Sequence, residues 1–101
     1  RAWLLSMRKP GSGPSLEERE RGWFRMLFHG RSPGAEVKTE IRGGEPGYSE
    51  TAKMLSEAAL CLAMDREIIP GTGGVLTPAS AFGLRLQERL SEAGINFKIL
   101  E

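Results

Sequence analysis

Apolar and polar residues alternate in two extended segments, 23–29 and 36–42, joined by a link that contains Pro33 and Gly34. A period of two indicates β-strands, and a short link with glycine is typical of an antiparallel hairpin. Because the second segment has one strictly charged face, we expect this sheet to be covered on one side only. The uncharged face is predicted to carry Phe24, Met26, Phe28, Val37, Thr39 and Ile41.

A helix is predicted after the glycine turn at 43–47, with Ser49 as its N-cap and Glu50 in its first turn. Its apolar arc is broad, which indicates a helix packed against the sheet. We therefore expect Leu55 and Leu62, on one stripe with Thr51 and Ala58, to be core residues.

A second helix begins at Thr77-Pro78, a cap residue followed by proline at the first helical position. Phe82, Leu86 and Leu90 follow at helical spacing, and Gly94 suits the C-terminal cap. The alternation in 95–101 predicts a last strand. The order strand–strand–helix–helix–strand indicates an α+β fold, a small antiparallel or mixed sheet with two main helices on one face.

The first part of the chain is expected to be a connection rather than part of this domain. Residues 1–8 have helical spacing but are too short for a stable helix, so they are expected to end a longer element. Residues 9–14 form a Pro/Gly linker, which gives a division into 1–14 and a domain at 15–101. Ser15 and Glu18 form a capping box for a short helix that ends near Gly22.

Composition narrows the classes of function. The 101 residues include 14 Lys and Arg against 13 Asp and Glu, a net charge of +1, which argues against a nucleic-acid partner. A single cysteine, Cys61, cannot form an internal disulfide and fits the cytoplasm. The longest apolar run, Ala58–Met64, is too short to span a bilayer.

Few residues suggest chemistry. The loop Gly71-Thr72-Gly73-Gly74 precedes a helix, but no lysine follows it as in a phosphate-binding loop, so a structural turn is favoured over an anion site. His29 is the only histidine, which leaves no histidine cluster for a metal, and Cys61 is most simply a small core residue.

The cluster of Tyr48, Thr51 and Lys53 at a glycine-flanked helix start is a further candidate, because if this start faces a cleft, its free N–H groups and Tyr48 could position a polar substrate. Turn and cap chemistry alone would also explain these residues. No complete catalytic set is present, and no catalytic or cofactor-binding residue can be assigned.

Four segments carry a resemblance to a known family. They are Gly22-Trp23-Phe24-Arg25, Glu45-Pro46-Gly47-Tyr48-Ser49-Glu50-Thr51-Ala52, Gly73-Gly74-Val75-Leu76-Thr77-Pro78-Ala79-Ser80-Ala81-Phe82 and Leu90-Ser91-Glu92-Ala93-Gly94-Ile95-Asn96-Phe97. Together they resemble the C-terminal region of saccharopine dehydrogenase-like oxidoreductases, the group that includes trans-acting enoyl reductases.

The resemblance implies a larger parent with an N-terminal Rossmann domain that binds NAD(P), and a C-terminal domain that shapes the substrate cleft and the dimer contact. The matching residues expected to approach that cleft are Tyr48, Ser49, Thr51, Gly73, Gly74 and Thr77. The nucleotide-binding half is absent, so this chain is expected to hold no cofactor and to be inactive alone. The alternative is a stand-alone dimerisation or scaffold module without catalysis.

Overall fold

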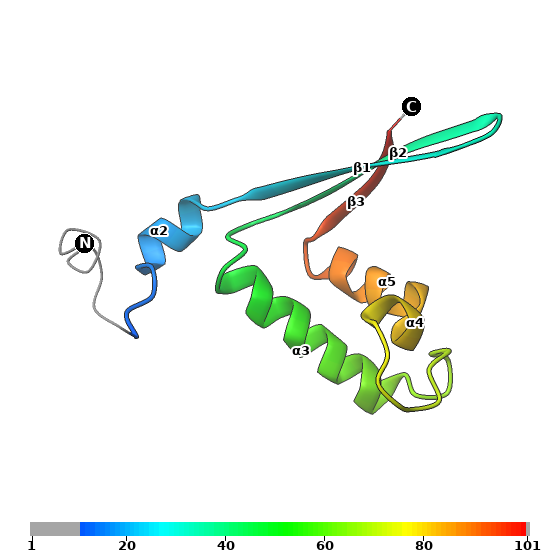
Figure 1. The fold of residues 1–101 in the computed structure, drawn as a ribbon. Coiled ribbons are helices and arrows are strands. Elements are labelled where there is room, and N and C mark those ends of the chain that lie inside the picture. The colour runs from blue at the N-terminus through cyan, green and yellow to red at the C-terminus, as the bar shows by residue number, and fades with distance from the viewer. Residues whose placement is uncertain (1–10, 101) are drawn as a thin grey trace, which may run out of the picture.

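A computed structural model describes residues 11–100 (Figure 1). The segment predicted at 1–8 lies outside these residues. The strands and main helices follow one another in the predicted order, and the fold is α+β. The elements are α2 (Leu16–Arg21), β1 (Phe24–Ser32), β2 (Ala35–Gly43), α3 (Ser49–Met64), α4 (Pro78–Phe82), α5 (Leu84–Glu92) and β3 (Asn96–Leu100).

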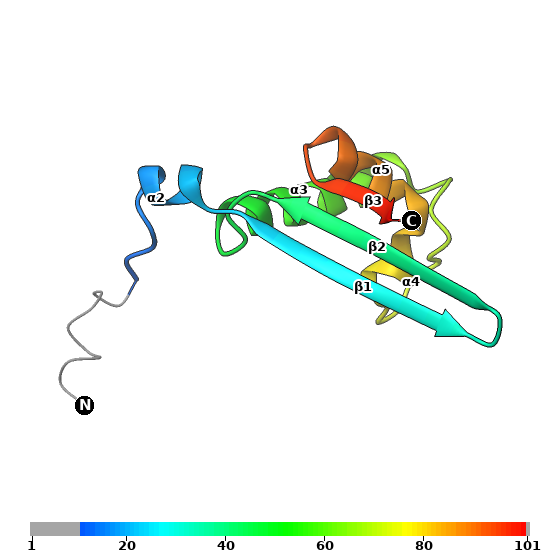
Figure 2. The ribbon, with the colours of Figure 1, turned by 90° about the horizontal axis from the view of Figure 1, so that it is seen from above.

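The three strands form one antiparallel sheet in the order β1-β2-β3. Ser32 pairs with Ala35, so Pro33 and Gly34 make a two-residue turn, and Gly34 has a φ of 82°. That positive φ is one that glycine adopts without steric cost. The hairpin is longer than predicted because pairing continues to this turn, which projects beyond the helices in Figure 2.

The two faces of the sheet differ as the alternation predicts. On one face Met26 pairs with Ile41, which pairs with Phe97. On the opposite face the Arg25 guanidinium donates to the Glu40 carboxylate at 2.5 Å, and Arg42 also pairs with Glu40. Glu40 is only 3% exposed. Burial acts to raise the Glu40 pKa, but the hydrogen bonds from both arginines outweigh it and the pKa is lowered.

An ion-pair cluster joins α3 to α5. The Asp65 carboxylate at the end of α3 accepts from Arg89 Nε at 2.5 Å and from Arg85 Nε at 3.0 Å. Arg89 also pairs with Glu57 of α3 at 3.4 Å. The hydrogen bonds from Arg89 and Arg85 lower the Asp65 pKa from 3.8 to about 2. This cluster, with buried Cys61 one turn before Asp65, fixes the face that α3 turns to α5.

The hydrophobic core is small. Among the described residues, the buried hydrophobic side chains are Cys61, Phe82, Leu90 and Ile95. Leu90 of α5 and Ile95 before β3 bring the helix layer to the sheet, and the Ile95 N–H donates to the Leu90 carbonyl. Many large apolar side chains therefore remain exposed.

The expectation that Leu55 and Leu62 lie in the core is wrong. Leu55 is 71% and Leu62 55% exposed. Apolar residues surround much of α3, so hydrophobicity alone does not choose the buried face; instead Cys61 and Asp65, at i and i+4, face the arginines of α5. Leu62 is rotated about 100° from Cys61 around the helix axis.

The second predicted helix is divided in two. Gly83 separates α4 from α5 with a φ of 58°, and its N–H donates to the Ala79 carbonyl. The short helix α2 has the predicted capping box, since the Glu18 N–H donates to Ser15 Oγ and the Ser15 N–H to the Glu18 carboxylate. No helix within residues 11–100 is long and apolar enough to cross a membrane.

Replacing Leu90 with alanine is expected to lower the free energy of unfolding by about 2–5 kcal/mol, because it removes a buried side chain and leaves a cavity. Leu55→Ala, on the exposed side of α3, should change it by less than about 0.5 kcal/mol. Urea unfolding followed by circular dichroism measures both. Equal losses for the two variants would contradict this placement of α3.

The lowered pKa of Asp65 predicts that the free energy of unfolding depends on pH in the acidic range. Its folded pKa of about 2 lies below the 3.8 of the unfolded chain, so its stabilisation is complete above about pH 4 and is lost as the pH falls towards 2. Asp65→Asn should lower stability at neutral pH and make the loss between about pH 4 and pH 2 smaller. Glu67→Gln, an exposed position after α3, is the control; an unchanged acid profile in Asp65→Asn would refute the role of the cluster.

Candidate functional site

The start of α3 is held by the side chain of Glu45. Its carboxylate accepts hydrogen bonds from the backbone N–H groups of Gly47 at 2.6 Å, Tyr48 at 2.8 Å and Ser49 at 3.0 Å. The bond from Ser49, together with those from Tyr48 and Gly47, lowers the Glu45 pKa. A negative charge at this end also complements the helix dipole.

Two expectations about this turn are therefore wrong. Ser49 is the first residue of the helix rather than its cap, and Tyr48 occupies the cap position without a side-chain hydrogen bond. The N–H groups that were expected to be free are already taken by Glu45. Thr51 Oγ1 donates to the Pro46 carbonyl at 2.6 Å, and Tyr48 is exposed. A role of Tyr48, Ser49 and Thr51 in a substrate cleft remains a prediction.

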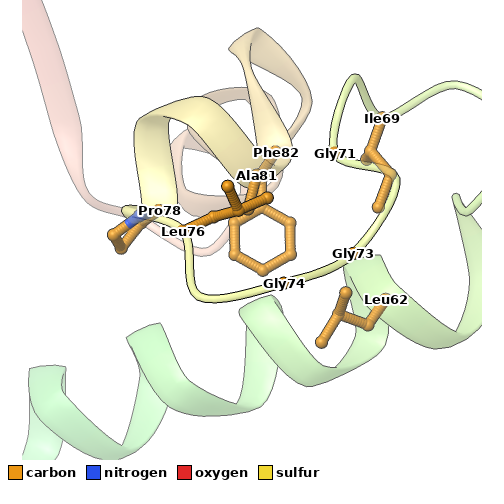
Figure 3. Close-up of a pocket in the computed structure, with 9 residues that line it drawn as sticks. All are labelled: Leu62, Ile69, Gly71, Gly73, Gly74, Leu76, Pro78, Ala81 and Phe82. Atoms are coloured by element: carbon orange, nitrogen blue, oxygen red, sulfur yellow. The ribbon is translucent and has the colours of Figure 1, made fainter.

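The loop at the other candidate position encloses a pocket of about 230 Å³, which we call the loop pocket. Figure 3 shows the Phe82 ring beside Leu76 and the glycine loop, with Leu62 of α3 below it. Gly73 and Gly74 have φ values of 130° and 104°, which favour glycine, and both line the pocket. Thr77 caps α4 by accepting from the Ser80 N–H. These contacts favour the structural turn over an anion site.

The two candidate turns do not meet. Tyr48 and Thr51 lie at the start of α3, whereas Gly73 and Gly74 lie against its last turns, where Leu62 contacts the loop pocket. A helix of 16 residues is about 24 Å long, and Figure 1 shows the two regions at opposite ends of it. If both turns border a substrate, they border different parts of it.

A second cavity lies between the helices and the apolar sheet face. We call it the sheet groove; its volume is about 380 Å³. Pro46, from the turn before Tyr48, forms part of its wall, so the groove is continuous with the start of α3. Its lining consists of Phe24, Met26, Ile41, Pro46, Met54, Leu90, Ile95 and Phe97.

The sequence predicted part of the lining of this groove. The alternation placed Phe24, Met26 and Ile41 on one face, but it could not show that α3 would pack mainly on α5 and leave space above that face. Met54, on the broad apolar arc of α3, forms one wall of the groove.

One buried carboxylate near the same helix start was also missed. Glu50 is 5% exposed; Lys53 donates to its Oε1 at 2.8 Å, while Oε2 has no hydrogen-bond partner. A buried oxygen without a partner is energetically costly and is available to accept a hydrogen bond. Sequence reasoning saw Glu50 only as a first-turn acid.

The remaining reactive side chains are occupied or buried. His29 lies 2.9 Å from the Glu36 carboxylate at the exposed face of the hairpin. Burial raises the pKa of the Cys61 thiol, which disfavours the nucleophilic thiolate. In the part of the chain that the structure describes, no group of three or more His, Cys, Asp or Glu side chains could hold a metal ion.

Comparison with known proteins finds relatives named as trans-acting enoyl reductases. A Mycobacterium tuberculosis protein named as a trans-acting enoyl reductase is 42% identical over 92 residues, which are 89% of this chain and 22% of the relative. The trans-acting enoyl reductases of Mycobacterium ulcerans and Mycobacterium bovis are 40% and 38% identical over 88 residues, 86% of this chain and 21% of each relative.

The chain thus spans about a fifth of the length of these relatives. No protein-family model matches it. No solved structure matches it either. Because the match extends over nearly nine-tenths of the chain, it spans both candidate turns.

Replacing Glu45 with alanine should expose three N–H groups at the start of α3 and loosen its first turn. We expect several-fold faster hydrogen exchange at Gly47, Tyr48 and Ser49, measured by NMR, with little change at the end of the helix. Glu45→Gln, which keeps one acceptor oxygen, should have a smaller effect. Unchanged exchange in Glu45→Ala would show that the carboxylate does not hold the turn.

Proposed function

We propose that this chain is the C-terminal, substrate-side domain of an NAD(P)-dependent oxidoreductase related to saccharopine dehydrogenase-like proteins and trans-acting enoyl reductases. The observation that carries the proposal is the 42% identity to a protein of that name across 89% of the chain. In this proposal residues 15–101 form the domain and 1–14 connect it to the part that binds the cofactor, in a cytoplasmic protein.

The matched segment is 22% of the relative, so about four-fifths of the relative lies outside it. A preceding Rossmann domain in that remainder would supply hydride from NAD(P)H. This domain would contribute walls of the substrate cleft, with Tyr48, Ser49, Thr51, Gly73, Gly74 and Thr77 as the candidates. It would not bind the cofactor or react alone.

The exposed apolar surface supports a covered position in a larger protein. Met26, Phe28, Val37 and Ile99 share the apolar sheet face, and each is at least 44% exposed. Figure 2 shows the hairpin extending past the helices. Contiguous exposed apolar surface of this kind is typical of an interface between domains or subunits.

The same exposed face also favours the second candidate, a stand-alone module that dimerises or acts as a scaffold. In that case the apolar hairpin would be covered by a second copy or another protein, and no reductase activity would depend on it. The two functions differ in one respect: only the first requires that a larger enzyme depends on this domain for its activity.

A domain exchange tests the proposal. The matching residues of the Mycobacterium ulcerans relative are replaced by this chain, and NADPH oxidation is measured with an enoyl thioester. We expect the chimera to retain activity within about tenfold if this chain and the replaced segment, which are 40% identical, perform the same role. A relative that lacks the segment should be inactive.

A chimera with Leu90→Asp, which disrupts the buried core, is the matched negative control. If the unmodified chimera is folded by circular dichroism and elutes like the relative, yet is as inactive as the deletion, the proposed function is wrong and the scaffold function is favoured.

A further inference from the structure

Strand β1 is an edge of the sheet, and within residues 11–100 it pairs with β2 alone. Figure 2 shows it as the outer strand along the whole length of the hairpin. In an antiparallel ladder successive residues alternate between the two sides, so every second residue of β1 turns its N–H and C=O to the free edge. This row of backbone donors and acceptors has the spacing that another extended chain matches.

The free edge lacks the features that usually prevent the addition of a strand. β1 is nine residues long, contains no proline and pairs one to one with β2 without a bulge. Stable sheet edges are commonly short, interrupted by proline or twisted by a bulge. In the middle of β1 the side chains of Met26, Leu27 and Phe28 are also exposed, so an added strand finds apolar neighbours on both faces of the sheet.

The charges beside this edge determine which side chains a matching strand carries. The polar face of the sheet has an excess of basic residues, with Arg25, Arg31, Lys38, Arg42 and Lys98 against Glu36 and Glu40. Near the turn a single carboxylate, that of Glu36, lies 2.9 Å from His29, 3.0 Å from Lys38 and 3.9 Å from Arg31.

β1 itself contributes Arg25, His29 and Arg31 to this face and no carboxylate. The Arg31 side chain is 74% exposed and lies 3.9 Å from Glu36, the one carboxylate that it shares. Opposite charges on directly paired residues stabilise a sheet. A strand that matches this edge therefore has carboxylates opposite Arg25 and Arg31, and apolar residues opposite Met26 and Phe28.

A second copy of β1 does not meet this requirement. Antiparallel pairing about Phe28 places Arg25 opposite Arg31, and pairing about Leu27 places Arg25 opposite His29. Neither register brings a carboxylate to the edge, and like charges directly opposite each other are destabilising. The edge is thus suited to a strand of different sequence rather than to its own copy.

We propose that a strand from the remainder of the parent protein pairs with the free edge of β1, and that this strand alternates apolar residues with carboxylates. The matched segment is 22% of the relative, and a strand from the rest of that length joins both parts in one sheet. The source of the strand rests on the proposed function, whereas the preference for an acidic strand is a property of β1 itself.

The preference of the edge is tested with two labelled peptides as long as β1, one alternating Glu with Val and one alternating Lys with Val. Each is titrated into the 101-residue chain by fluorescence anisotropy, and amide exchange of residues 23–32 is followed by mass spectrometry. We expect the Glu peptide to bind saturably and to slow the amides that face the free edge. The Lys peptide should bind more weakly by several-fold and protect less.

Arg31→Glu should weaken binding of the Glu peptide several-fold and strengthen that of the Lys peptide, because it reverses a charge beside the edge. Lys98→Glu is the matched control, since it makes the same change opposite a glutamate of β2 but on the other side of the sheet. It should bind both peptides like the unmodified chain. Circular dichroism verifies that both variants are folded, and the comparison of the two peptides on the unmodified chain does not depend on either variant.

The source of the strand is tested in the domain chimera. We expect the amides of residues 23–32 that exchange quickly in the isolated chain to exchange slowly in the chimera, because the added strand bonds them. Equal binding of the two peptides, no protection by either, or protection of β1 through self-association of the chain alone would overturn the inference. A folded chimera whose β1 amides still exchange quickly would also overturn it.

These outcomes are separate from those for the proposed function. An inactive chimera with a protected β1 would contradict the proposed function alone. An active chimera with an unprotected β1 would contradict this inference alone.

Discussion

The ion pairs of Asp65 with Arg85 and Arg89 are the constraint on which the arrangement of this domain depends. They join the last residue of the α3 region to α5, and α5 in turn leads through Ile95 into the third strand. A partly buried carboxylate with two arginines is stable only while all three groups keep their partners, since an unpaired charge in this position is costly. The cluster thus sets the rotation of α3, and that rotation decides which apolar residues are buried.

The sheet groove follows from the same constraint. Because α3 turns its closest contacts to α5, it does not press flat on the strands, and the space between Met54 and the apolar sheet face stays open. The ion pairs and the groove thus belong to the same arrangement, in which α3 packs on α5 and the apolar sheet face stays open beside Met54.

The strands and the order of the elements could be predicted from the sequence, because the alternation at Phe24, Met26 and Phe28 is a local pattern that indicates a β-strand. The burial of Leu55 and Leu62 could not, because α3 is apolar nearly all round and the deciding partners, Arg85 and Arg89, come more than twenty residues later. Local chemistry also failed at Ser49, which is the first residue of the helix and donates its own N–H to the Glu45 carboxylate instead of capping the helix with its hydroxyl. The candidate turns were found, but their separation along α3 is a property of the folded helix.

Cys61 gives this architecture a chemical reporter. It is the only cysteine of the chain, it is fully buried on the side of α3 that bears Asp65, and its thiol holds its proton more tightly than usual. A thiol reagent can therefore modify it only in molecules whose two helices have transiently parted. The rate of modification reports those openings at this one position, so the separation of α3 from α5 can be followed as a kinetic event without the introduction of any further reactive group.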